Sequence, residues 1–334
     1  MTDVPSVTIA GDPPGHDLGW IPGGNFRMGS DAHYPEEAPA RDVEVSGFWI
    51  SRHAVTNDDF ATFVAESGYV TGAERPLDPN DFPGAPAENL VPGSMVFTMT
   101  PRPVDLRHLS QWWTWTPGAS WKHPSGPASG IANQGSHPVV HVAHEDALAY
   151  AIWAGLSLPT EAQWECAARG GIEGATYVWG DEPEAPGERR AHYWHGDFPW
   201  RPESGYGATA PVGSYAANGF GLFDMAGNVW EWTDDWYVET RFADEAPCCA
   251  PRDPRGGSAE DSLDPRQPQF RVPRKVIKGG SYLCADSYCL RYRPAARRPQ
   301  MIDTGMSHIG FRCVSASSSD GLAGNERHGV KNRD

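Results

Sequence analysis

The chain has 334 residues, which is enough for one large domain or two ordinary ones, each with a substantial core. Its formal net charge of -16 argues against a nucleic-acid-binding surface as the main function and suits a basic peptide partner. The 37 Gly, 31 Pro and 14 Trp residues predict a loop-rich fold packed by aromatic side chains and exclude a disordered chain.

Polar segments without periodicity begin and end the chain, so residues 1–16 and 317–334 are expected to be flexible tails. No long linker and no repeat of fixed period lies between them to mark a second domain. The alternating run at 42–51 predicts a strand. A helix is predicted to begin after Thr56, as N-cap, and to end at Gly68. The segment 75–135 is rich in Pro, Gly and Asp and is expected to be loop.

The next segments predict a strand and two helices. Alternation favours a strand over 137–143. Acidic residues in a first turn and Gly155 at the end delimit a helix that follows it. Thr160 and Gln163 predict a capping box at the start of another helix, which Gly170 ends. Cys166 lies inside that helix and is expected to be packed rather than reactive.

Residues 240–272 are expected to be a second long loop, and 274–282 a further strand. The elements together predict an α+β fold, a single compact mixed domain over 17–316 with little regular secondary structure. The N-terminus has neither a basic start nor an apolar run, and no run of about 18 apolar residues occurs, so neither a secretory signal nor a transmembrane helix is expected. We therefore expect a cytoplasmic protein.

Two histidine groups raise the question of a metal site. His137, His141 and His144 would converge on an ion only if they lay on one helix, and Pro138 with the valines after it favours a strand. Packing or hydrogen bonding is therefore the expected role. The same expectation applies to the segment "HYWHGD", which holds His192, His195 and Asp197.

The segment "DMAGNVWEW", residues 224–232, allows two interpretations. Asp224, followed by Gly227 and Asn228, could turn the backbone so that carbonyls point inward around a hard cation such as Ca²⁺. Alternatively, the segment is a tight turn that leads into an aromatic core strand.

Cys284 and Cys289 lie five residues apart in a turn-like stretch and allow three interpretations. A disulfide would fit, because the separation permits the short Cα distance. Zinc is disfavoured, because no second Cys or His pair lies nearby at a usable spacing. Two thiolates alone suit a soft monovalent ion such as Cu(I), and Arg291 and Arg293 would favour the thiolates if they lie close by. Such a metal would carry one-electron or O₂ chemistry.

The other cysteines are Cys166, Cys248, Cys249 and Cys313. An even number of cysteines in a large chain without a secretory signal argues only weakly for a disulfide framework. The adjacent pair Cys248 and Cys249 cannot easily form a disulfide with each other and is expected to lie in a loop.

Several motifs resemble those of the formylglycine-generating enzymes, in the sulfatase-modifying factor family. They are "IPGGNFRMGSDAHYPEEAP", "WAGLSLPTEAQWECAARGG", "NGFGLFDMAGNVWEWTDDW", "GGSYLCADSYCLRYRPAAR" and "HIGFRCV". The resemblance implies the formylglycine-generating-enzyme fold, which is C-type-lectin-like and is shared by many non-enzymes. The motif that separates the enzymes from these is GGSxxCxxxxCxRYR, and it is intact at 279–293.

The resemblance implies an oxidase that converts the cysteine of a Cys-x-Pro-x-Arg motif in sulfatases to Cα-formylglycine, with O₂ and an external thiol. Cys284 and Cys289 would hold Cu(I), and the substrate cysteine would add a third thiolate. The other residues that the resemblance assigns are Ser281 and Tyr288, which orient the site, and Trp230, Arg291 and His308, which bind substrate. The expected partner is a nascent or unfolded sulfatase polypeptide, with no nucleic acid and no membrane, and the expected state is a monomer.

Several positions depart from the family pattern. Secreted members form two further disulfides, whose four cysteines would fall at positions 151, 168, 294 and 313. Three of these are Ala151, Ala168 and Pro294 here, and only Cys313 remains, which agrees with a reducing cytoplasm. His308 stands where Asn is usual, so a pocket hydrogen bond is expected to differ.

The resemblance also implies two structural Ca²⁺ sites. One would use Asp224 with the carbonyls of Gly227 and Val229 and is expected to be retained. The other falls at His192, Tyr193, Ser204 and Tyr206. There a nitrogen and a neutral hydroxyl replace an amide oxygen and a carboxylate, so we expect at most one tightly held Ca²⁺.

Two other functions remain open. An iron-dependent sulfoxide synthase of the same fold would carry an N-terminal helical bundle with an H-x₃-H-x-E motif, which this sequence lacks. A non-catalytic binding paralogue would lack the paired cysteines. Conversion of a Cys-x-Pro-x-Arg peptide to the aldehyde separates the three functions.

Overall fold

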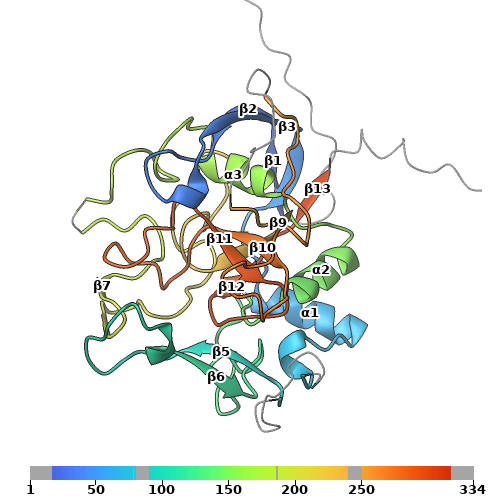
Figure 1. Cartoon of the computed structure of the whole chain (residues 1–334), viewed down its shortest axis with the longest axis vertical. Helices are drawn as coiled ribbons and strands as arrows, with labels where there is room; N and C mark the ends of the chain where they lie inside the picture. The colour runs from blue at the N-terminus through green and yellow to red at the C-terminus, as the bar shows by residue number, and fades with distance from the viewer. Residues whose placement is uncertain (1–16, 78, 80–89, 186, 240–249, 317–334) are drawn as a thin grey trace, which may run out of the picture.

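The computed structural model describes residues 17–316 except 78, 80–89, 186 and 240–249. The predicted tails and the adjacent Cys248 and Cys249 lie outside the described residues. The fold is a mixed α+β domain in which three α-helices accompany several small sheets (Figure 1). No helix in the described part of the chain is long and apolar enough to cross a membrane.

A four-stranded sheet lies at the centre of the molecule. It contains β9 (Trp230–Trp236), β10 (Arg274–Lys278), β11 (Arg297–Met301) and β12 (Ile309–Gly310). The order is β11-β10-β9-β12, and only the β12–β9 pair is parallel. The aromatic strand expected after the turn at 224–229 is therefore an inner strand of this sheet. Residues 274–282 form a strand only as far as Lys278, because Gly279 and Gly280 adopt positive φ angles of 91° and 72°.

A second sheet brings the two ends of the described chain together. It contains β1 (Leu18–Ile21), β4 (Phe48–Ser51) and β13 (Val314–Ala316), with β4 in the middle. A separate hairpin pairs β2 (Gly24–Met28) with β3 (Arg41–Val45). The single strand predicted at 42–51 is thus wrong, because β3 and β4 belong to different sheets. The break between β3 and β4 falls at Ser46 and Gly47, and a Cβ atom at Gly47 would lie only 2.7 Å from the ring of Trp20.

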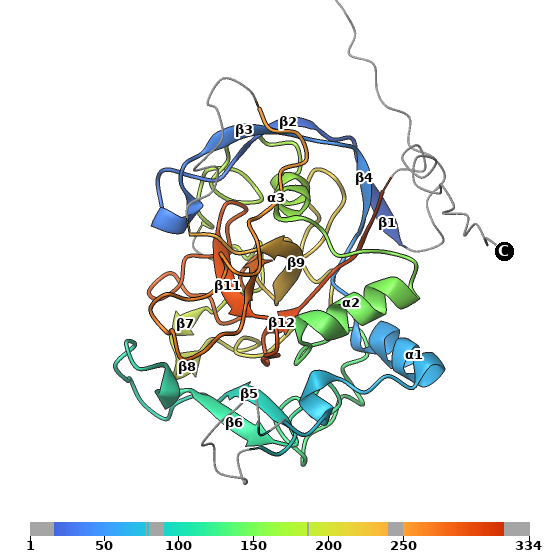
Figure 2. The ribbon, with the colours of Figure 1, turned by 45° about the vertical axis from the view of Figure 1, so that its right-hand side comes forward.

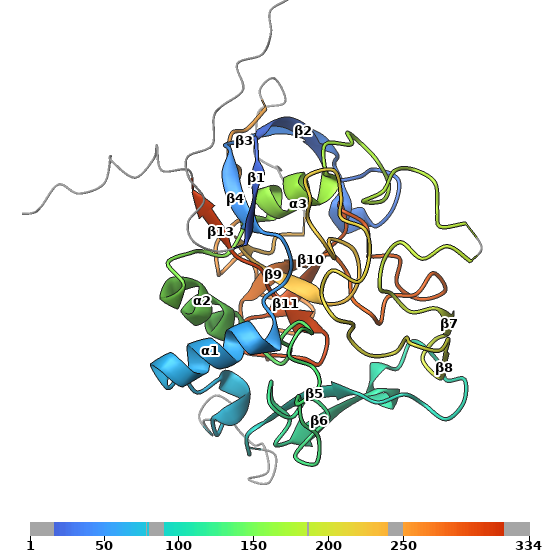
Figure 3. The same ribbon diagram turned by 180° about the vertical axis from the view of Figure 1, so that it is seen from behind.

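The three predicted α-helices are confirmed. They are α1 (Asn57–Ser67), α2 (His144–Trp153) and α3 (Glu161–Arg169). Thr160 and Gln163 form the expected capping box of α3, and Gly170 ends that helix in the left-handed conformation. Cys166 is buried and packed, as expected, and burial raises its pKa to about 12. The helices α1 and α2 lie side by side, and α3 lies between the β2–β3 hairpin and the central sheet (Figures 2 and 3).

Residues 137–143 do not form the predicted strand. Their backbone groups bond to two separate segments, since Val139 N–H donates to the Val55 carbonyl and His141 N–H donates to the Met306 carbonyl. The φ angle of His141 is +60°, which interrupts an extended backbone.

The loop expected at 75–135 contains an antiparallel hairpin, β5 (Gly93–Phe97) with β6 (Trp113–Pro117). This hairpin lies at the lower edge of the molecule in Figure 1. The remaining short elements are β7 (Gly196–Asp197), β8 (Arg201–Pro202), and the 3₁₀ helices η1 (Pro35–Glu37), η2 (Gly72–Glu74) and η4 (Leu109–Gln111).

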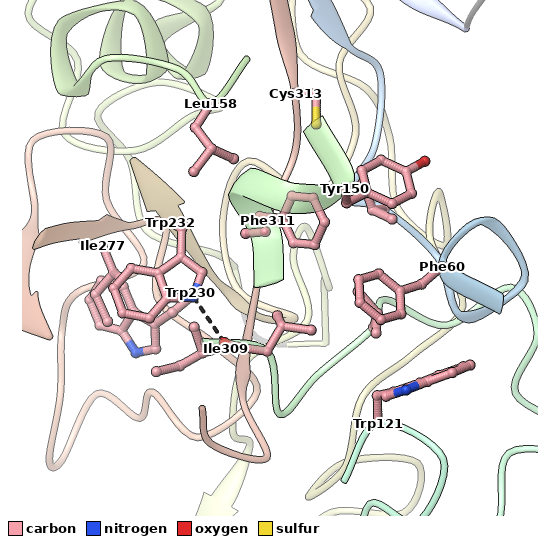
Figure 4. Packing of buried hydrophobic residues seen from close by; sticks show 14 of the residues in the cluster. Phe60, Trp121, Tyr150, Leu158, Trp230, Trp232, Ile277, Ile309, Phe311 and Cys313 are labelled. Carbon is pink, nitrogen blue, oxygen red and sulfur yellow. Dashed lines mark hydrogen bonds between the residues drawn. The ribbon is translucent and has the colours of Figure 1, made fainter. Parts of the chain in front are cut away.

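The main hydrophobic core lies between α1, α2 and the central sheet. Figure 4 shows Trp230 and Trp232 of β9 in this core, together with Phe60 of α1 and Phe311 after β12. Cys284 and Cys289 belong to the same buried cluster. The candidate site is therefore built on the wall of the core rather than on an exposed loop tip, which fixes its side chains by packing.

Buried ion pairs connect the other face of the central sheet to α3. Lys278 of β10 lies 3.0 Å from Glu165, and Arg297 of β11 lies 2.8 Å from Glu161. Arg312 pairs with Glu231 of β9 at 2.6 Å. The charges near α3 share partners, since Glu165 also pairs with Arg169 and Lys278 also approaches Glu161, so they form a buried network in which each charge is compensated.

Candidate active site

The two cysteines lie in a compact turn that follows β10. Cys284 N–H donates to the Ser281 carbonyl at 2.9 Å, and Cys289 N–H donates to the Ala285 carbonyl at 2.7 Å. Gly280 allows the entry to this turn, because a Cβ there would lie 2.9 Å from the backbone of Tyr292. The turn folds both side chains toward the same point.

The sulfur atoms of Cys284 and Cys289 lie 3.3 Å apart, and both residues are free and buried. A disulfide would require about 2.05 Å, so the structure contains two thiol groups in hydrogen-bond contact rather than a covalent bridge. Of the three interpretations of the sequence, the disulfide does not describe this state.

The two thiols differ in their acidity. The hydrogen bond from Cys284 lowers the pKa of Cys289, and the guanidinium groups of Arg291 and Arg298 lower it further, against the opposing effect of burial. Burial raises the pKa of Cys284, and the hydrogen bond to Cys289 adds to that effect. Cys289 is therefore the thiolate of the pair, and Cys284 is the thiol that donates to it.

The donor set is two sulfur atoms and no more. Among the described residues, no group of three or more His, Cys, Asp or Glu side chains could hold a metal ion. A two-sulfur site lacks the four ligands that structural zinc requires. It fits a soft monovalent ion, for which thiolates are the preferred ligands.

His137, His141 and His144 have the packing and hydrogen-bonding roles that the sequence predicts. The ring nitrogens of His141 lie 2.8 Å from Ser94 Oγ and 2.9 Å from the Pro124 carbonyl oxygen. His137 contacts the hydroxyl of Thr209, and His144 packs edge-on against Trp232.

The two arginines of the motif have different partners. Arg291 donates to Glu36 at 2.6 Å and lies over the ring of Tyr34, and it still contributes to the lowered pKa of Cys289. Arg293 is almost fully buried and forms a bidentate ion pair with Glu37. Arg293 would favour the thiolates only if it lay close by, and its charge is balanced by Glu37, whereas Arg291 and Arg298 are the arginines that lower the pKa of Cys289.

Ser281 and Tyr288 flank the pair. Ser281 Oγ accepts a hydrogen bond from Leu283 N–H at 3.2 Å and so stabilises the turn that carries Cys284. The Tyr288 ring stacks on Phe198 at 4.6 Å and meets Trp112 edge-on at 5.8 Å. Phe198 and Trp112 belong to a separate aromatic cluster next to the β5–β6 hairpin, which the sequence does not link to the site. The roles of Ser281 and Tyr288 in catalysis remain predictions.

Trp230 and His308 are both buried, so neither side chain lines an open surface. The Trp230 side chain is 1% exposed and packs in the core cluster shown in Figure 4. His308 is also buried, 4.7 Å from the ring of Trp113, and its Nδ1 has no hydrogen-bond partner in the described part of the chain. Burial lowers the pKa of His308, and Arg298 lowers it further. His308 is therefore neutral, with one polar atom available to a ligand. The binding roles of both residues remain predictions.

Asp224 lies in the expected turn and has a positive φ of 55°. Its Oδ2 accepts a hydrogen bond from Gly213 N–H at 2.8 Å, and burial raises its pKa. Gly227 N–H donates to the Gly279 carbonyl, and Val229 packs in a small buried cluster. The turn therefore holds one partly buried carboxylate beside the base of the cysteine turn. Whether it holds Ca²⁺ remains a prediction.

The other family calcium position is filled by aromatic packing. His192 Nε2 lies 2.7 Å from the Ala208 carbonyl oxygen, and the His192 ring stacks on Tyr206 at 5.3 Å. Tyr193 stacks on Tyr292 at 4.0 Å, whereas Ser204 is exposed. The His192 side chain is therefore engaged with the Ala208 carbonyl, whereas the Ser204 hydroxyl lies at the surface.

Arg298 is a site residue that sequence reasoning missed. The signal was the pair of adjacent arginines in "AARRP", because neighbouring residues of a strand face opposite sides of the sheet. Arg297 faces Glu161 of α3, and Arg298 acts electrostatically on the cysteine pair.

Comparison with known proteins places these features in a family. Residues 9–317 match the model of the sulfatase-modifying factor enzyme 1-like domain. The formylglycine-generating enzyme of Mycobacterium tuberculosis is 54% identical over 299 residues, which cover 88% of this chain and 96% of that protein. The formylglycine-generating enzyme of Thermomonospora curvata is 45% identical over 306 residues, covering 88% of this chain and 92% of the relative.

A solved structure supports the fold independently. PvdO from Pseudomonas aeruginosa superimposes with a TM-score of 0.58 and covers 92% of this chain and 100% of its own. Its sequence identity is 22%, so this likeness concerns the fold alone.

Proposed function

The chain belongs to the sulfatase-modifying factor enzyme 1-like family, and from that membership we propose that it is an oxidoreductase that converts a cysteine of a sulfatase to formylglycine. The observation that carries this proposal is the pair of free, buried thiols of Cys284 and Cys289, 3.3 Å apart and of unequal acidity. A binding module of the same fold has no need for two such groups on the wall of its core.

The thiolates of Cys284 and Cys289 would hold Cu(I). Bound there, the ion would supply one-electron chemistry with O₂. The donor set supports this choice, since the described residues offer two soft ligands and no hard one to complete a zinc site. Burial of the pair removes bulk water from the position where a substrate thiolate would approach as third ligand.

The proposed overall reaction balances with an external thiol as reductant. The substrate CH₂–SH group becomes an aldehyde and releases its sulfur as H₂S. Dioxygen accepts four electrons, two from the substrate carbon and two from a pair of external thiols, which leave as a disulfide. Both oxygen atoms of O₂ end as water. Hydrolysis of the thioaldehyde consumes one water, whose oxygen becomes that of the aldehyde, so one water is released net.

The chain's own groups would bind and position the substrate. Cys289, the more acidic thiol, would be the first ligand available as thiolate, and Cys284 would give up its proton when the metal binds. His308 Nδ1, buried and without a partner in the described structure, could bond to a peptide group of the substrate. Tyr288, held between Phe198 and Trp112, would fix the position of the approaching chain.

The proposed substrate is an extended peptide with a Cys-x-Pro-x-Arg motif in an unfolded sulfatase. The net charge of -16 supports a partner that carries an arginine. The proline restricts the free peptide to extended conformations and lowers the entropic cost of binding. Aldehyde formation on such a peptide tests this proposal.

The remaining proposals concern a structural calcium ion, the cellular compartment and the oligomeric state. Asp224, with the carbonyls of Gly227 and Val229, is proposed to hold one structural Ca²⁺, supported by the partly buried carboxylate in a turn of positive φ. The proposed compartment is the cytoplasm, supported by the four described cysteines, which are all free. The proposed state is a monomer.

A further inference from the structure

Two adjacent arginines of β11 point to opposite sides of the central sheet. Arg297 is fully buried and donates to Glu161 on the α3 side. Arg298 is half-buried and pairs in register with Ile277 of β10, so the two side chains lie on the same face of the sheet. Ile277 belongs to the buried cluster that contains Cys284 and Cys289, which places Arg298 on the side of the cysteine turn. This placement follows from the alternation of a strand and needs no special loop geometry.

Arg298 differs from the other arginines around the site in its partners. Arg291 pairs with Glu36, Arg293 with Glu37 and Arg297 with Glu161. In contrast, no carboxylate in the described part of the chain forms an ion pair with Arg298. A half-buried guanidinium without an anion is unusual, because removal of its charge from water is costly unless a partner compensates for it.

The charge of Arg298 acts on several groups of the candidate site. For Cys289 it adds to the pKa-lowering effects of the Cys284 hydrogen bond and of Arg291. For His308 it adds to the effect of burial, which also lowers the pKa. For Cys284 and Tyr288, burial dominates and raises the pKa, and Arg298 opposes that rise. Arg298 therefore lies within electrostatic reach of both sulfurs and of the unpartnered His308.

The proposed reaction creates the anion that Arg298 lacks. Two thiolates around a monovalent cation carry one net negative charge, and a substrate thiolate raises this to two. Such a charge in a buried site requires a nearby cation that is not already neutralised. The charge of Arg291 is shared with Glu36, so it can compensate only in part.

We propose that Arg298 is the positioning residue that balances the negative charge of the cysteine pair and of the incoming substrate thiolate. It acts through Cys284 and Cys289 and does not need to touch the substrate carbon. This inference rests on the proposed function for the identity of the anion. The location of the unpaired cation beside the sulfurs rests on the structure alone.

The first test measures the electrostatic potential at the Cys289 sulfur in the metal-free protein. Iodoacetate and iodoacetamide alkylate the same thiolate, so the ratio of their rates at Cys289 cancels the thiolate fraction and reports the local positive potential. Peptide mass spectrometry identifies the labelled cysteine. In Arg298→Gln the iodoacetate-to-iodoacetamide ratio should fall several-fold, and Arg298→Lys should keep it. Arg271→Gln removes the same charge at a side chain that is 77% exposed and should leave the ratio unchanged.

The second test measures Cu(I) affinity by competition with a chromophoric chelator. An opposite charge within a few ångströms shifts an ionisation by about one unit, or about tenfold. Arg298→Gln should therefore weaken Cu(I) binding by about tenfold, with recovery in Arg298→Lys. The KM for a Cys-containing peptide should rise in Arg298→Gln and return toward the wild-type value in Arg298→Lys.

The two tests separate the possible failures. If wild-type protein does not bind Cu(I), the proposed function fails, whereas the alkylation ratio still decides where the cation lies. If wild-type protein binds Cu(I) and Arg298→Gln binds it equally well, the role of Arg298 is wrong while the proposed function stands. An unchanged alkylation ratio in Arg298→Gln would overturn the inference outright.

Discussion

Arg293 and Glu37 form a bidentate ion pair in which both side chains are almost completely buried, although 256 positions separate them in the sequence. The pair joins the segment after the cysteine turn to the 3₁₀ helix η1 near the N-terminus. The neighbouring pair of Arg291 and Glu36 joins the same two segments at a partly exposed position. The cysteine turn is therefore held in place from the N-terminal part of the domain.

Replacement of Arg293 by Met should destabilise the fold by about 3–5 kcal/mol, because the fully buried Glu37 carboxylate would lose its bidentate guanidinium partner. Chemical denaturation monitored by Trp fluorescence measures this loss. The control is Arg252→Ala, at an exposed pair with Glu44, for which a change of about 0–1 kcal/mol is expected. Equal stability of Arg293→Met and wild type would show that the buried pair does not stabilise the native state.

Replacement of Cys284 or Cys289 by Ser should abolish turnover and leave the fold intact. A hydroxyl has a high pKa and is a hard ligand, so it cannot hold Cu(I) as a thiolate does. Circular dichroism and thermal unfolding should match wild type, whereas Cu(I) binding and aldehyde formation should be lost. Cys166→Ala serves as the control, because that thiol is buried in α3 and should affect activity little. Turnover by either Ser variant would exclude the two-thiolate site.

The sequence predicted much of the local structure of the helices and of the cysteine turn. Thr160, Gln163 and Gly170 define the limits of α3 by side-chain and backbone rules that act within a few residues. The predicted strand at 137–143 failed because its conformation depends on distant groups. His141 is held at a positive φ by contacts with Ser94 and with the carbonyl of Pro124, which no local pattern reveals.

In the candidate site, too, some features follow from the local sequence and others depend on distant residues. The spacing of Cys284 and Cys289 identified the pair, but their unequal acidity depends on Arg298 of β11 as well as on Arg291. The β5–β6 hairpin was missed because a long connection joins its strands in place of a short turn. The alternating "WTWTP" at 113–117 was the available signal. The local sequence therefore predicts the cysteine turn itself, whereas the acidity of its thiols depends on residues that are distant in the sequence.

Calcium should bind with a stoichiometry of at most one. Asp224 supplies the carboxylate, whereas His192 is engaged with the Ala208 carbonyl and Ser204 is exposed. Elemental analysis after dialysis against Ca²⁺ and then buffer measures the bound ion. Asp224→Asn should abolish tight binding, and His192→Gln should not reduce it. Two retained equivalents of Ca²⁺ in wild type would contradict the assignment.

The stability of the protein should depend on His141 at mildly acidic pH. Burial lowers the pKa of His141 to about 4, against about 6.5 in an unfolded chain. The unfolded state therefore binds more protons, and the stabilisation by neutral His141 is present above about pH 6.5 and is lost as the pH falls toward 4. Between pH 7 and pH 5 this share amounts to about 2 kcal/mol.

The contribution of His141 to the unfolding free energy is tested by comparing the pH profiles of His141→Asn and wild type. Asn tolerates the positive φ of this position, so the variant should fold with a lower stability at pH 7. Its unfolding free energy should fall less between pH 7 and pH 5 than that of wild type. The comparison removes the opposite contribution of Asp146, whose pKa burial raises to about 6. The exposed His108→Asn controls for the loss of a histidine, and parallel profiles for His141→Asn and wild type would contradict the prediction.

The most direct measurement of the central claim is formation of an aldehyde on a synthetic peptide. The protein, loaded with Cu(I), is incubated in air with a thiol reductant and an extended Cys-x-Pro-x-Arg peptide, and the product is identified by mass spectrometry and by capture with a hydroxylamine reagent. We predict conversion of the cysteine to formylglycine by wild type, slower conversion when the peptide Arg is replaced by Ala, and none by Cys284→Ser or Cys289→Ser. Absence of aldehyde with Cu(I)-loaded wild type, or conversion by either Ser variant, would contradict the account.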